Sequence, residues 1–590
     1  MKRVALLVSL LVCLATTAQA QTQKSALCTR DNALETTRQQ ILFTRTFDNA
    51  VHRIAVLLRA ADLLWPHEQD KALAAFMEAF DLAVQNYKEN GDEIQRTSKS
   101  QFAAIIPLPD QRFKVVTALA KRDPARARKL SEQILQDDAR DATDKPATDD
   151  KTKKAIAEKI LGTAYSLAAT DVISAVNFAH QSLRYPATLS LPSFLYELAK
   201  TNKAAADQFY VEALNAYRTA PMDQFLYLSS YPFANTREAG EMPSYRYYTI
   251  PEGFAPNRTL ERQFMQALLA RVDAAMGTPV QEVANYRYSD HAQMWFALTR
   301  LEKQVQADLP DLADVLAASK DKLFALLNPP VQRQISGLID DQDAPKKSFD
   351  EQVEAAEKLT DVARRDQNLT FAVTGSSSDE PVDKVLSVID KISDSDVRAA
   401  LLNWFYYFRT QALIQQKELA EARKFASKVT ELDQRAYLFT RIAEESLKVA
   451  EDQTEARELL NEIANAISKA PKTVVSARAL LALAHLYAKI DMNRGVEELG
   501  NAVRTINAIE LPDFSQQFVM MKIEGKTFGS YAAYSTPGFN PENAFREMGK
   551  LDFDGSLSQA TNFSDKSLRA LTTLAVIEPC FATKTHKTRK

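Results

Sequence analysis

Apolar residues recur at helical spacing along most of the chain. Between residues 41 and 65 they fall mostly three or four positions apart, at Ile41, Phe47, Val51, Ile54, Leu58, Ala61 and Trp65. Pro66 removes a backbone donor and stops or kinks that helix, and a second apolar face follows over residues 73–84. No alternating run is bounded by an Asn-Gly or Asp-Gly turn, the strongest short-range sign of a β-hairpin. The pattern therefore predicts an all-α chain with almost no strand.

A short motif recurs along the sequence and indicates a helix start. In order, the motif has an apolar residue, a small residue, an acid, two spacer residues, a position that is usually apolar, a base and a small residue. It occurs at 392–399, 429–436 and 563–570, with a weaker copy at 108–115. We expect Ser393, Thr430 and Ser564 to cap the free N–H groups of the helices that follow. The similarity extends backwards in one pair, because 382–399 also matches 553–570. Unequal steps between copies predict an irregular array of helical hairpins, a solenoid.

The base of the motif has a predicted structural role. Arg398, Arg435 and Arg569 each stand four residues after an acid at a predicted helix start. This spacing favours an i,i+4 ion pair, and each side chain could also reach a neighbouring repeat. A second recurring element, Glu-Ala-Arg at 421–423 and 455–457, places a small alanine where two helices can approach closely.

One segment resembles a tetratricopeptide repeat. In residues 155–186, Leu161, Gly162 and Tyr165 match the Leu-Gly-x-x-Tyr positions of that motif, and Ser174, Phe178 and Pro186 match its later small, aromatic and proline positions. Glu158 and Gln181 depart from the pattern. The resemblance implies an irregular solenoid similar to tetratricopeptide-repeat proteins. The whole chain is also similar to a group of uncharacterised exported helical proteins of soil bacteria.

Several segments interrupt the helical pattern and suggest region boundaries. Residues 21–218 form a predicted N-terminal helical repeat region with a charged, flexible linker at 137–154. A middle helical region spans 259–372, repeats similar to tetratricopeptide repeats span 380–580, and a basic tail covers 582–590.

Residues 219–258 form a loop insert rich in tyrosine and proline. Five prolines exclude a long regular helix there. Tyrosines combine apolar area with a polar tip and suit recognition, so we expect Tyr231, Tyr245 and Tyr247 to contribute to a binding surface. The alternative is that the tyrosines cover a gap in the solenoid.

The first twenty residues have the pattern of a signal peptide. Lys2 and Arg3 precede an apolar stretch from Val4 to Ala15, and Ala18-Gln19-Ala20 fits a cleavage site before Gln21. We therefore expect a periplasmic or secreted protein, and we find no later apolar run long enough for a transmembrane segment. Without residues 1–20, which carry two bases and no acid, the formal net charge falls from −3 to −5. This balance argues against nucleic acid as a partner.

Composition and cysteine usage narrow the picture further. Only 14 glycines occur, which argues against sandwiches and barrels with their many tight turns. Beyond the signal peptide the only cysteines are Cys28 and Cys580. Export permits a disulfide between them, but an open solenoid would keep the two ends apart whereas a closed or strongly curved array would bring them together.

No catalytic, metal or cofactor motif is present. Gly525-Lys526-Thr527 lacks the first glycine of a phosphate loop, because Met520 stands there. The six histidines include no pair at i,i+3 or i,i+4, so no helix-borne metal site is indicated, and no Gly-x-Ser-x-Gly elbow occurs. Two functions remain: a non-enzymatic scaffold that binds a peptide or protein partner, and, as the alternative, a helical carbohydrate-active enzyme or glycan-binding protein of the cell envelope. The sequence predicts no cofactor and leaves the oligomeric state unknown.

Overall fold

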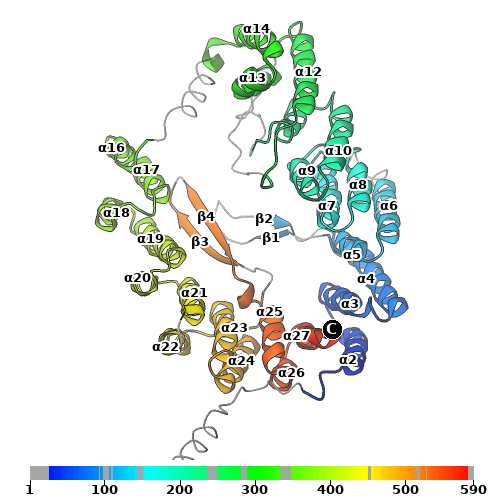
Figure 1. Ribbon diagram of the computed structural model, residues 1–590, viewed down its shortest axis with the longest axis vertical. Coiled ribbons are helices and arrows are strands. Elements are labelled where there is room, and N and C mark those ends of the chain that lie inside the picture. The colour runs from blue at the N-terminus through cyan, green and yellow to red at the C-terminus, as the bar shows by residue number, and fades with distance from the viewer. Residues whose placement is uncertain are drawn as a thin grey trace, which may run out of the picture. The chain divides into compact units, whose positions relative to one another are not determined.

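The computed structural model is built almost entirely of helices arranged as stacked hairpins (Figure 1). It describes residues 25–91, 94–96, 105–107, 110–141, 150–235, 249–280, 289–332, 335, 347–449, 453–510, 512–514, 518–526 and 528–582. The chain divides into two compact units: unit 1 takes Met1–Glu78, Ser98–Ala103 and Lys346–Lys590, and unit 2 takes Ala79–Thr97 and Ala104–Pro345. The prediction of an all-α fold of repeated helical hairpins is confirmed. Among the described helices, none has both the length and the apolarity to span a bilayer.

Unit 1 combines the two ends of the chain. Its N-terminal part contains α2 (Arg30–Phe43), η1 (Thr44–Thr46), α3 (Ala50–Leu64) and the start of α4 (Gln69–Asn90). Its C-terminal helices are α16 (Phe349–Glu357), α17 (Val362–Thr374), α18 (Val382–Ile389), α19 (Ser395–Gln415), α20 (Leu419–Ala426), α21 (Leu432–Val449), α22 (Thr454–Ser468), α23 (Val474–Ala488), α24 (Met492–Asn507), α25 (Pro541–Leu551), α26 (Phe553–Thr561), α27 (Lys566–Ile577) and η5 (Glu578–Phe581). Because α2 and α3 pack against α27, and α2 also against η5, the N-terminal helices complete the C-terminal array.

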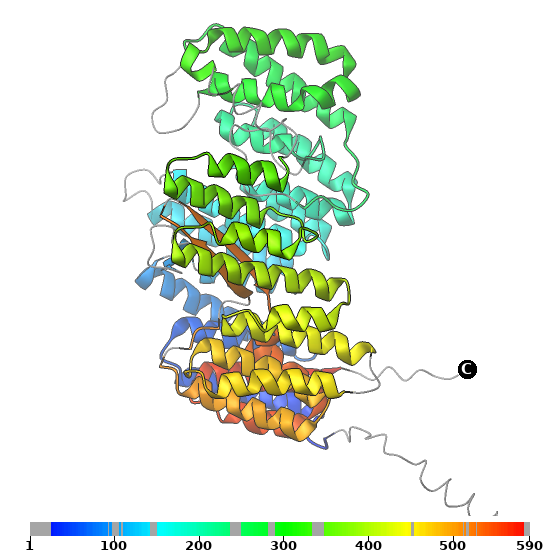
Figure 2. The same ribbon diagram turned by 90° about the vertical axis from the view of Figure 1, so that its left-hand side faces the viewer.

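Helices of unit 1 form two rows within the stack. Figure 2 shows the helices between residues 349 and 449 lying nearly parallel. In Figure 1, α17, α19, α21 and α23 form one row, and α18, α20 and α22 lie to the left of it. Helix α23 contacts α21, α22, α24 and α25, which explains why it is buried on nearly all sides. The small alanines of the Glu-Ala-Arg elements, Ala422 and Ala456, are buried where hairpins meet.

Unit 1 also contains a β-hairpin that the sequence analysis missed. Strands β3 (Phe518–Glu524) and β4 (Gly529–Ser535) pair antiparallel, with Met520 opposite Ala533, and η4 (Pro537–Phe539) follows. The expectation of no hairpin is therefore wrong for this segment. Val519, Met521 and Ile523 alternate with less buried residues, so the period of two was present. The turn contains Gly525-Lys526 rather than Asn-Gly, so it lacks the sequence sign of a hairpin.

The recurring motif arginines hold the turn before each helix. Arg398 donates to the Ile392 carbonyl at 3.1 Å, Arg435 to the Val429 carbonyl at 3.5 Å, and Arg569 to the Phe563 carbonyl at 2.6 and 2.9 Å. In each case the acceptor lies six residues earlier and belongs to a fully buried apolar residue. The expected i,i+4 ion pair with the preceding acid does not form at these positions, because the guanidinium turns back to the carbonyl instead.

Backbone N–H groups of the same turns are satisfied from the neighbouring hairpin. Asp366 accepts from the Ser393 N–H at 3.0 Å, Asn403 from the Thr430 N–H at 2.8 Å, and Asn507 from the Ser564 N–H at 2.8 Å. The cap of two of these helices is the acid that follows the small residue: Asp394 caps α19 and Asp565 caps α27. The predicted caps at Ser393 and Ser564 are therefore wrong by one residue.

We expect alanine substitution of the three motif arginines to destabilise unit 1 in the order Arg569, Arg398, Arg435. Arg569 makes two hydrogen bonds and lies 6.0 Å from the Phe43 ring, whereas the Arg435 bond is the longest. Loss of such a bond leaves a carbonyl unpaired and lowers the free energy of unfolding by about 1–3 kcal/mol. Denaturant unfolding measures the effect. Arg441→Ala, which removes only an exposed pair with Glu444, is the control; an equal loss there would contradict the assignment.

Unit 2 contains the remaining hairpins. It includes β1 (Ile94–Arg96), β2 (Ile105–Pro107), α5 (Gln111–Ala120), α6 (Pro124–Asp141), α7 (Asp150–Leu167), α8 (Val172–Ser182), α9 (Ser190–Thr201), α10 (Lys203–Ala216), α11 (Met222–Leu226), η3 (Tyr227–Ser229), α12 (Arg258–Ala275), α13 (Asp290–Asp308) and α14 (Pro310–Leu326). Helices α6 and α7 extend into the predicted linker at 137–154, of which 142–149 lie outside the described residues. Helices α7 and α8 form the hairpin of the segment that resembles a tetratricopeptide repeat. Leu161 and Phe178 are buried there, whereas Gly162 and Tyr165 are exposed.

The described part of the predicted insert belongs to the core of unit 2. Residues 222–229 are helical, and Phe225 stacks on Phe264 with ring centroids 5.1 Å apart. Tyr231 is 0% exposed, packs between the rings of Tyr196 and Tyr210, and donates from its hydroxyl to Asp207 at 2.8 Å. The prediction that Tyr231 contributes to a binding surface is therefore wrong: its ring fills the core. Tyr245 and Tyr247 lie outside the described residues.

The region boundaries predicted from the sequence differ from the boundaries of the two compact units. The sequence separated 21–218 from 380–580, whereas residues 25–78 pack with the C-terminal repeats, and 79–97 with 104–345 form the other unit. A boundary based on linkers cannot detect this arrangement, because it depends on helices more than 500 residues apart in the chain.

Candidate binding site on the hairpin face of unit 1

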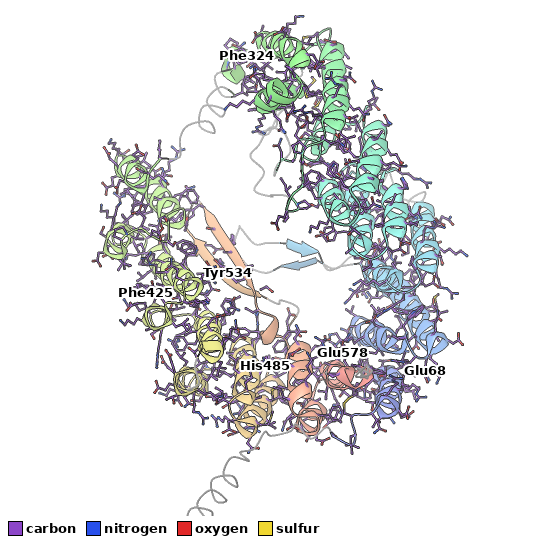
Figure 3. All side chains as sticks on the ribbon, viewed as in Figure 1. Glu68, Phe324, Phe425, His485, Tyr534 and Glu578 are labelled. Atoms are coloured by element: carbon purple, nitrogen blue, oxygen red, sulfur yellow. A yellow bond between two sulfur atoms is a disulfide. The ribbon has the colours of Figure 1, made fainter. Side chains whose placement is uncertain are left out.

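The β3–β4 hairpin lies on one side of the helical stack of unit 1. Strand β3 packs against α19 and α21, η4 packs against α23 and α25, and the Phe528 ring lies 5.7 Å from that of Phe371 on α17. We call this side of α17, α19, α21 and α23 the hairpin face. Figure 3 shows Tyr534 on this side and Phe425 on the opposite side of the row. Tyr534 lies 4.9 Å from Tyr407, ring to ring.

Two buried amides fasten β3 to the helices. Asn403 of α19 donates to the side-chain carbonyl of Gln434 at 2.6 Å, and Gln434 donates to the backbone carbonyl of Met520 at 3.1 Å. Both amide side chains are at least nine-tenths buried. Because a buried amide without partners would be strongly unfavourable, this relay fixes the strand to α19 and α21.

The relay also shows which way the hairpin edges face. In an antiparallel pair the N–H and C=O of one residue point to the same side. The Met520 carbonyl points away from β4, since Gln434 binds it, so its partner Ala533 points its backbone groups away from β3. At the turn, the Gly525 N–H donates to the Phe528 carbonyl at 3.0 Å, so this pair points inward. Counting residue pairs from it along the ladder again makes Met520 and Ala533 an outward-pointing pair. The backbone groups of Gly529, Tyr531, Ala533 and Ser535 therefore face the outer edge of β4.

The outer edge of β4 lacks the usual protection. Within the described residues, no strand other than β3 pairs with β4. Its seven residues, Gly-Ser-Tyr-Ala-Ala-Tyr-Ser, include no charge and no proline, and Tyr531 is 44% exposed. Natural sheets generally block such edges with lysine, proline or a bulge, because an unblocked edge pairs with another strand.

A cavity lies behind β3, among the first turns of α19, α21 and α23. Its volume is about 560 Å³. The lining combines the carboxylates of Asp396, Glu431 and Asp433 with the Trp404 indole and the Asn403–Gln434 amide pair. Across the described residues, no group of three or more His, Cys, Asp or Glu side chains is arranged to hold a metal ion.

The residues that the sequence singled out are not brought together at this site. Arg398, Arg435 and Arg569 hold turns, Tyr231 lies in the core of unit 2, and none of them lines the cavity. Cys28 and Cys580 are joined in the structure, with Cα atoms 5.2 Å apart. Sequence reasoning missed Asn403, Asp433 and Gln434, because single polar residues in helices carry no local signal of a shared site.

Comparisons with known proteins add little to this description. No protein-family model matches the sequence, and no curated protein matches it. Among solved structures, the chain is similar to a "Circular tandem repeat protein with novel repeat topology and enhanced subunit contact surfaces", at 10% identity over 93% of this chain and 97% of that chain, with a TM-score of 0.18. A TM-score this low does not support a shared fold, so the repeat fold is assigned from the helices of this chain.

Proposed function

We propose that this protein is an exported, non-enzymatic helical-repeat scaffold that holds an extended segment of a partner protein. The partner segment adds as a strand to the outer edge of β4. The observation that carries this proposal is that, within the described residues, β4 pairs with β3 alone: the stack of helices holds a strand whose outer backbone edge has the geometry for strand addition. The resemblance of residues 155–186 to a tetratricopeptide repeat also supports an interaction scaffold, since helical repeats offer extended binding surfaces.

Substitution at Ala533 tests strand addition. Proline there removes an outward N–H that β3 does not use, so the hairpin keeps its own ladder while the edge loses a donor. The probe is a set of linear peptides selected on the wild-type protein from a displayed library. We expect the selected peptides to bind Ala533→Pro at least about tenfold more weakly, the equivalent of one or two hydrogen bonds. Isothermal titration calorimetry measures the difference.

Two further variants separate a blocked edge from a damaged fold. Ala533→Ser keeps the N–H and should bind as the wild type does. Ala533→Lys places a charge on the same edge, keeps the backbone unrestricted and should weaken binding. If the peptides bind all variants equally, or if no peptide is selected, strand addition at β4 is wrong.

Export is part of the proposal and has its own test. The charged start, apolar core and Ala18-Gln19-Ala20 site support cleavage after Ala20. We expect the protein recovered from the periplasm or medium to begin at Gln21, as read by N-terminal sequencing. Recovery of the protein in the cytoplasm with residues 1–20 intact would contradict export.

A carbohydrate-active or glycan-binding role is the second candidate. Its support is the cavity, in which an indole, carboxylates and amides lie together as they do in many sugar sites. Neutral sugars therefore serve as a competing ligand class in the next experiment.

A further inference from the structure

The cavity behind β3 has the size and the mixed lining of a small-molecule site. Its volume of about 560 Å³ falls within the range typical of ligand pockets, about 300–1,000 Å³. Its walls come from α19, α21, α23 and β3, whose lining residues span more than 120 positions of the chain. The Asn403–Gln434–Met520 relay joins three of these elements, so the cavity has a fixed frame within unit 1.

The charge of the lining is unbalanced. Asp396, Glu431 and Asp433 form no ion pair in the described part of the chain. The lysine of the lining, Lys522, is paired with Glu524 at 2.6 Å. Acids in the first turn of a helix are ordinary, because they face the positive end of the helix dipole, and Asp396 and Asp433 occupy such positions. Asp433, however, is more buried than a solvated acid in the first turn of a helix.

Asp433 carries a carboxylate where a charge is unfavourable. Burial raises its pKa, and the charge of Glu431 raises it further, while its hydrogen bond from the Gln434 N–H at 2.9 Å and the positive charge of Arg478 act the other way without cancelling the rise. Arg478 donates instead to Thr536 at 3.1 Å and lies against the Phe539 ring. A cation placed between Asp433 and Glu431 would offset the cost of burying the charged Asp433 carboxylate. It would also offset the repulsion between the two carboxylates.

The remaining wall suits an organic cation. Trp404 supplies an indole, the best of the aromatic rings for attracting a cation, and it is held in place by stacking on Phe408 at 4.9 Å. Because the described residues hold no group of three or more His, Cys, Asp or Glu side chains arranged for a metal, the lining fits an organic cation better than a metal ion.

We propose that this cavity binds an ammonium or guanidinium group on a short aliphatic chain. The group is a free diamine or guanidine, or the side chain of a lysine or arginine in a bound protein. Its N–H donors meet Asp433, Glu431 and Asp396, and its charge lies against Trp404. This site is separate from the β4 edge, so its failure leaves the proposed strand addition untouched.

Calorimetric titration of the full-length mature protein tests the site with defined probes. Agmatine and cadaverine represent the free cations, a short arginine-containing peptide represents the side-chain source, and 1-pentanol and cellobiose are the uncharged comparisons. We expect agmatine or cadaverine to bind with one site and the uncharged probes not to bind. Binding of the peptide but of neither free cation assigns the site to a protein side chain. Cellobiose binding without cation binding would overturn the proposal in favour of a sugar site.

Two carboxylate variants locate the binding. Asp433→Asn and Glu431→Gln should each weaken cation binding about tenfold, the loss expected for one charge-assisted hydrogen bond. Glu444→Gln changes an exposed acid of the same helix outside the cavity and should leave binding unchanged. Equal binding by all three variants would overturn the proposal, and so would a wild type that binds none of agmatine, cadaverine and the arginine-containing peptide.

Stability and pH separate a binding role from a structural one. Because the folded protein raises the pKa of Asp433, the ionised carboxylate destabilises the fold as pH rises through that pKa, and Asp433→Asn should have a melting temperature at pH 7 no lower than the wild type. Cation binding needs the ionised form, so it should weaken on acidification at a pH above the ordinary aspartate value of 3.8. A variant that lost both stability and binding would show that Asp433 is structural.

Discussion

Replacing Cys28 and Cys580 with serine is expected to lower the free energy of unfolding of unit 1 by about 2–5 kcal/mol, the range for loss of a native disulfide. The disulfide joins two cysteines that are 552 residues apart in the sequence, and it links the segment just before α2 to η5. A cross-link across so long a loop restricts the unfolded chain strongly. The expectation applies to the oxidised pair, as it stands in the structure.

Polar contacts at the same junction hold the ends together but do not replace the bond. Glu578 of η5 accepts from both Arg59 of α3 and Arg546 of α25, and Lys566 donates to the Thr46 carbonyl at 2.6 Å. Figure 3 places Glu578 beside the disulfide. These contacts are partly exposed, so each contributes less than the covalent link.

Thermal unfolding with and without reductant measures the contribution of the disulfide. Reductant should lower the melting temperature of the wild type to that of the Cys28→Ser/Cys580→Ser variant and leave the variant unchanged. Alkylation followed by mass spectrometry provides the independent check. Two free thiols in the protein isolated without reductant would rule out the pairing.

The second large effect is expected for Arg112→Ala in unit 2, a loss of about 3–5 kcal/mol, as for breaking a buried ion pair. Arg112 is 4% exposed, donates to Asp110 at 2.9 Å and to Asp138 at 2.6 Å, and lies 3.3 Å from the centre of the Tyr87 ring. Its removal leaves the buried Asp110 with Lys159, at 3.1 Å, as its remaining ion-pair partner.

The pH dependence of stability follows from Asp110. Burial raises its pKa, but Arg112 and Lys159 outweigh burial and hold the pKa below its usual value. This depressed pKa stabilises the fold at pH values above the ordinary aspartate pKa, and the stabilisation is lost as pH falls through the folded-state pKa. Arg112→Ala should therefore differ most from the wild type near neutral pH and least in strong acid.

Two controls make the Arg112 prediction specific. Arg112→Lys keeps the charge but loses the planar fork and the stacking on Tyr87, so it should remain clearly destabilised. Arg128→Ala removes only an exposed i,i+4 pair with Glu132 and should change stability by less than about 0.5 kcal/mol. Denaturant unfolding provides the values, and a loss for Arg112→Ala no larger than that for Arg128→Ala would contradict the buried network.

Local features of this fold could be predicted from the sequence because they depend on neighbouring residues. Apolar spacing of three and four residues predicted the helices, and Pro66 predicted the end of α3, which stops at Leu64. The repeated frame around Arg398, Arg435 and Arg569 predicted a shared structural role, since one turn geometry recurs wherever the motif does. Even there the partner was wrong, because a carbonyl six residues back competes with the acid four residues back.

Only the tertiary structure decided which distant residues share a surface. Cys28 and Cys580 meet because α2 and α3 complete the C-terminal array, and Tyr231 is buried because α9 and α10 enclose it. The cavity joins Asp396, Asp433 and β3 through the stacking of hairpins, and each of these residues read alone is an ordinary helix-start acid or strand residue. Helix formation is set by apolar spacing over a few turns, whereas packing between hairpins depends on contacts across the whole chain. The sequence therefore determined the elements and their repeat, and the tertiary packing determined the site.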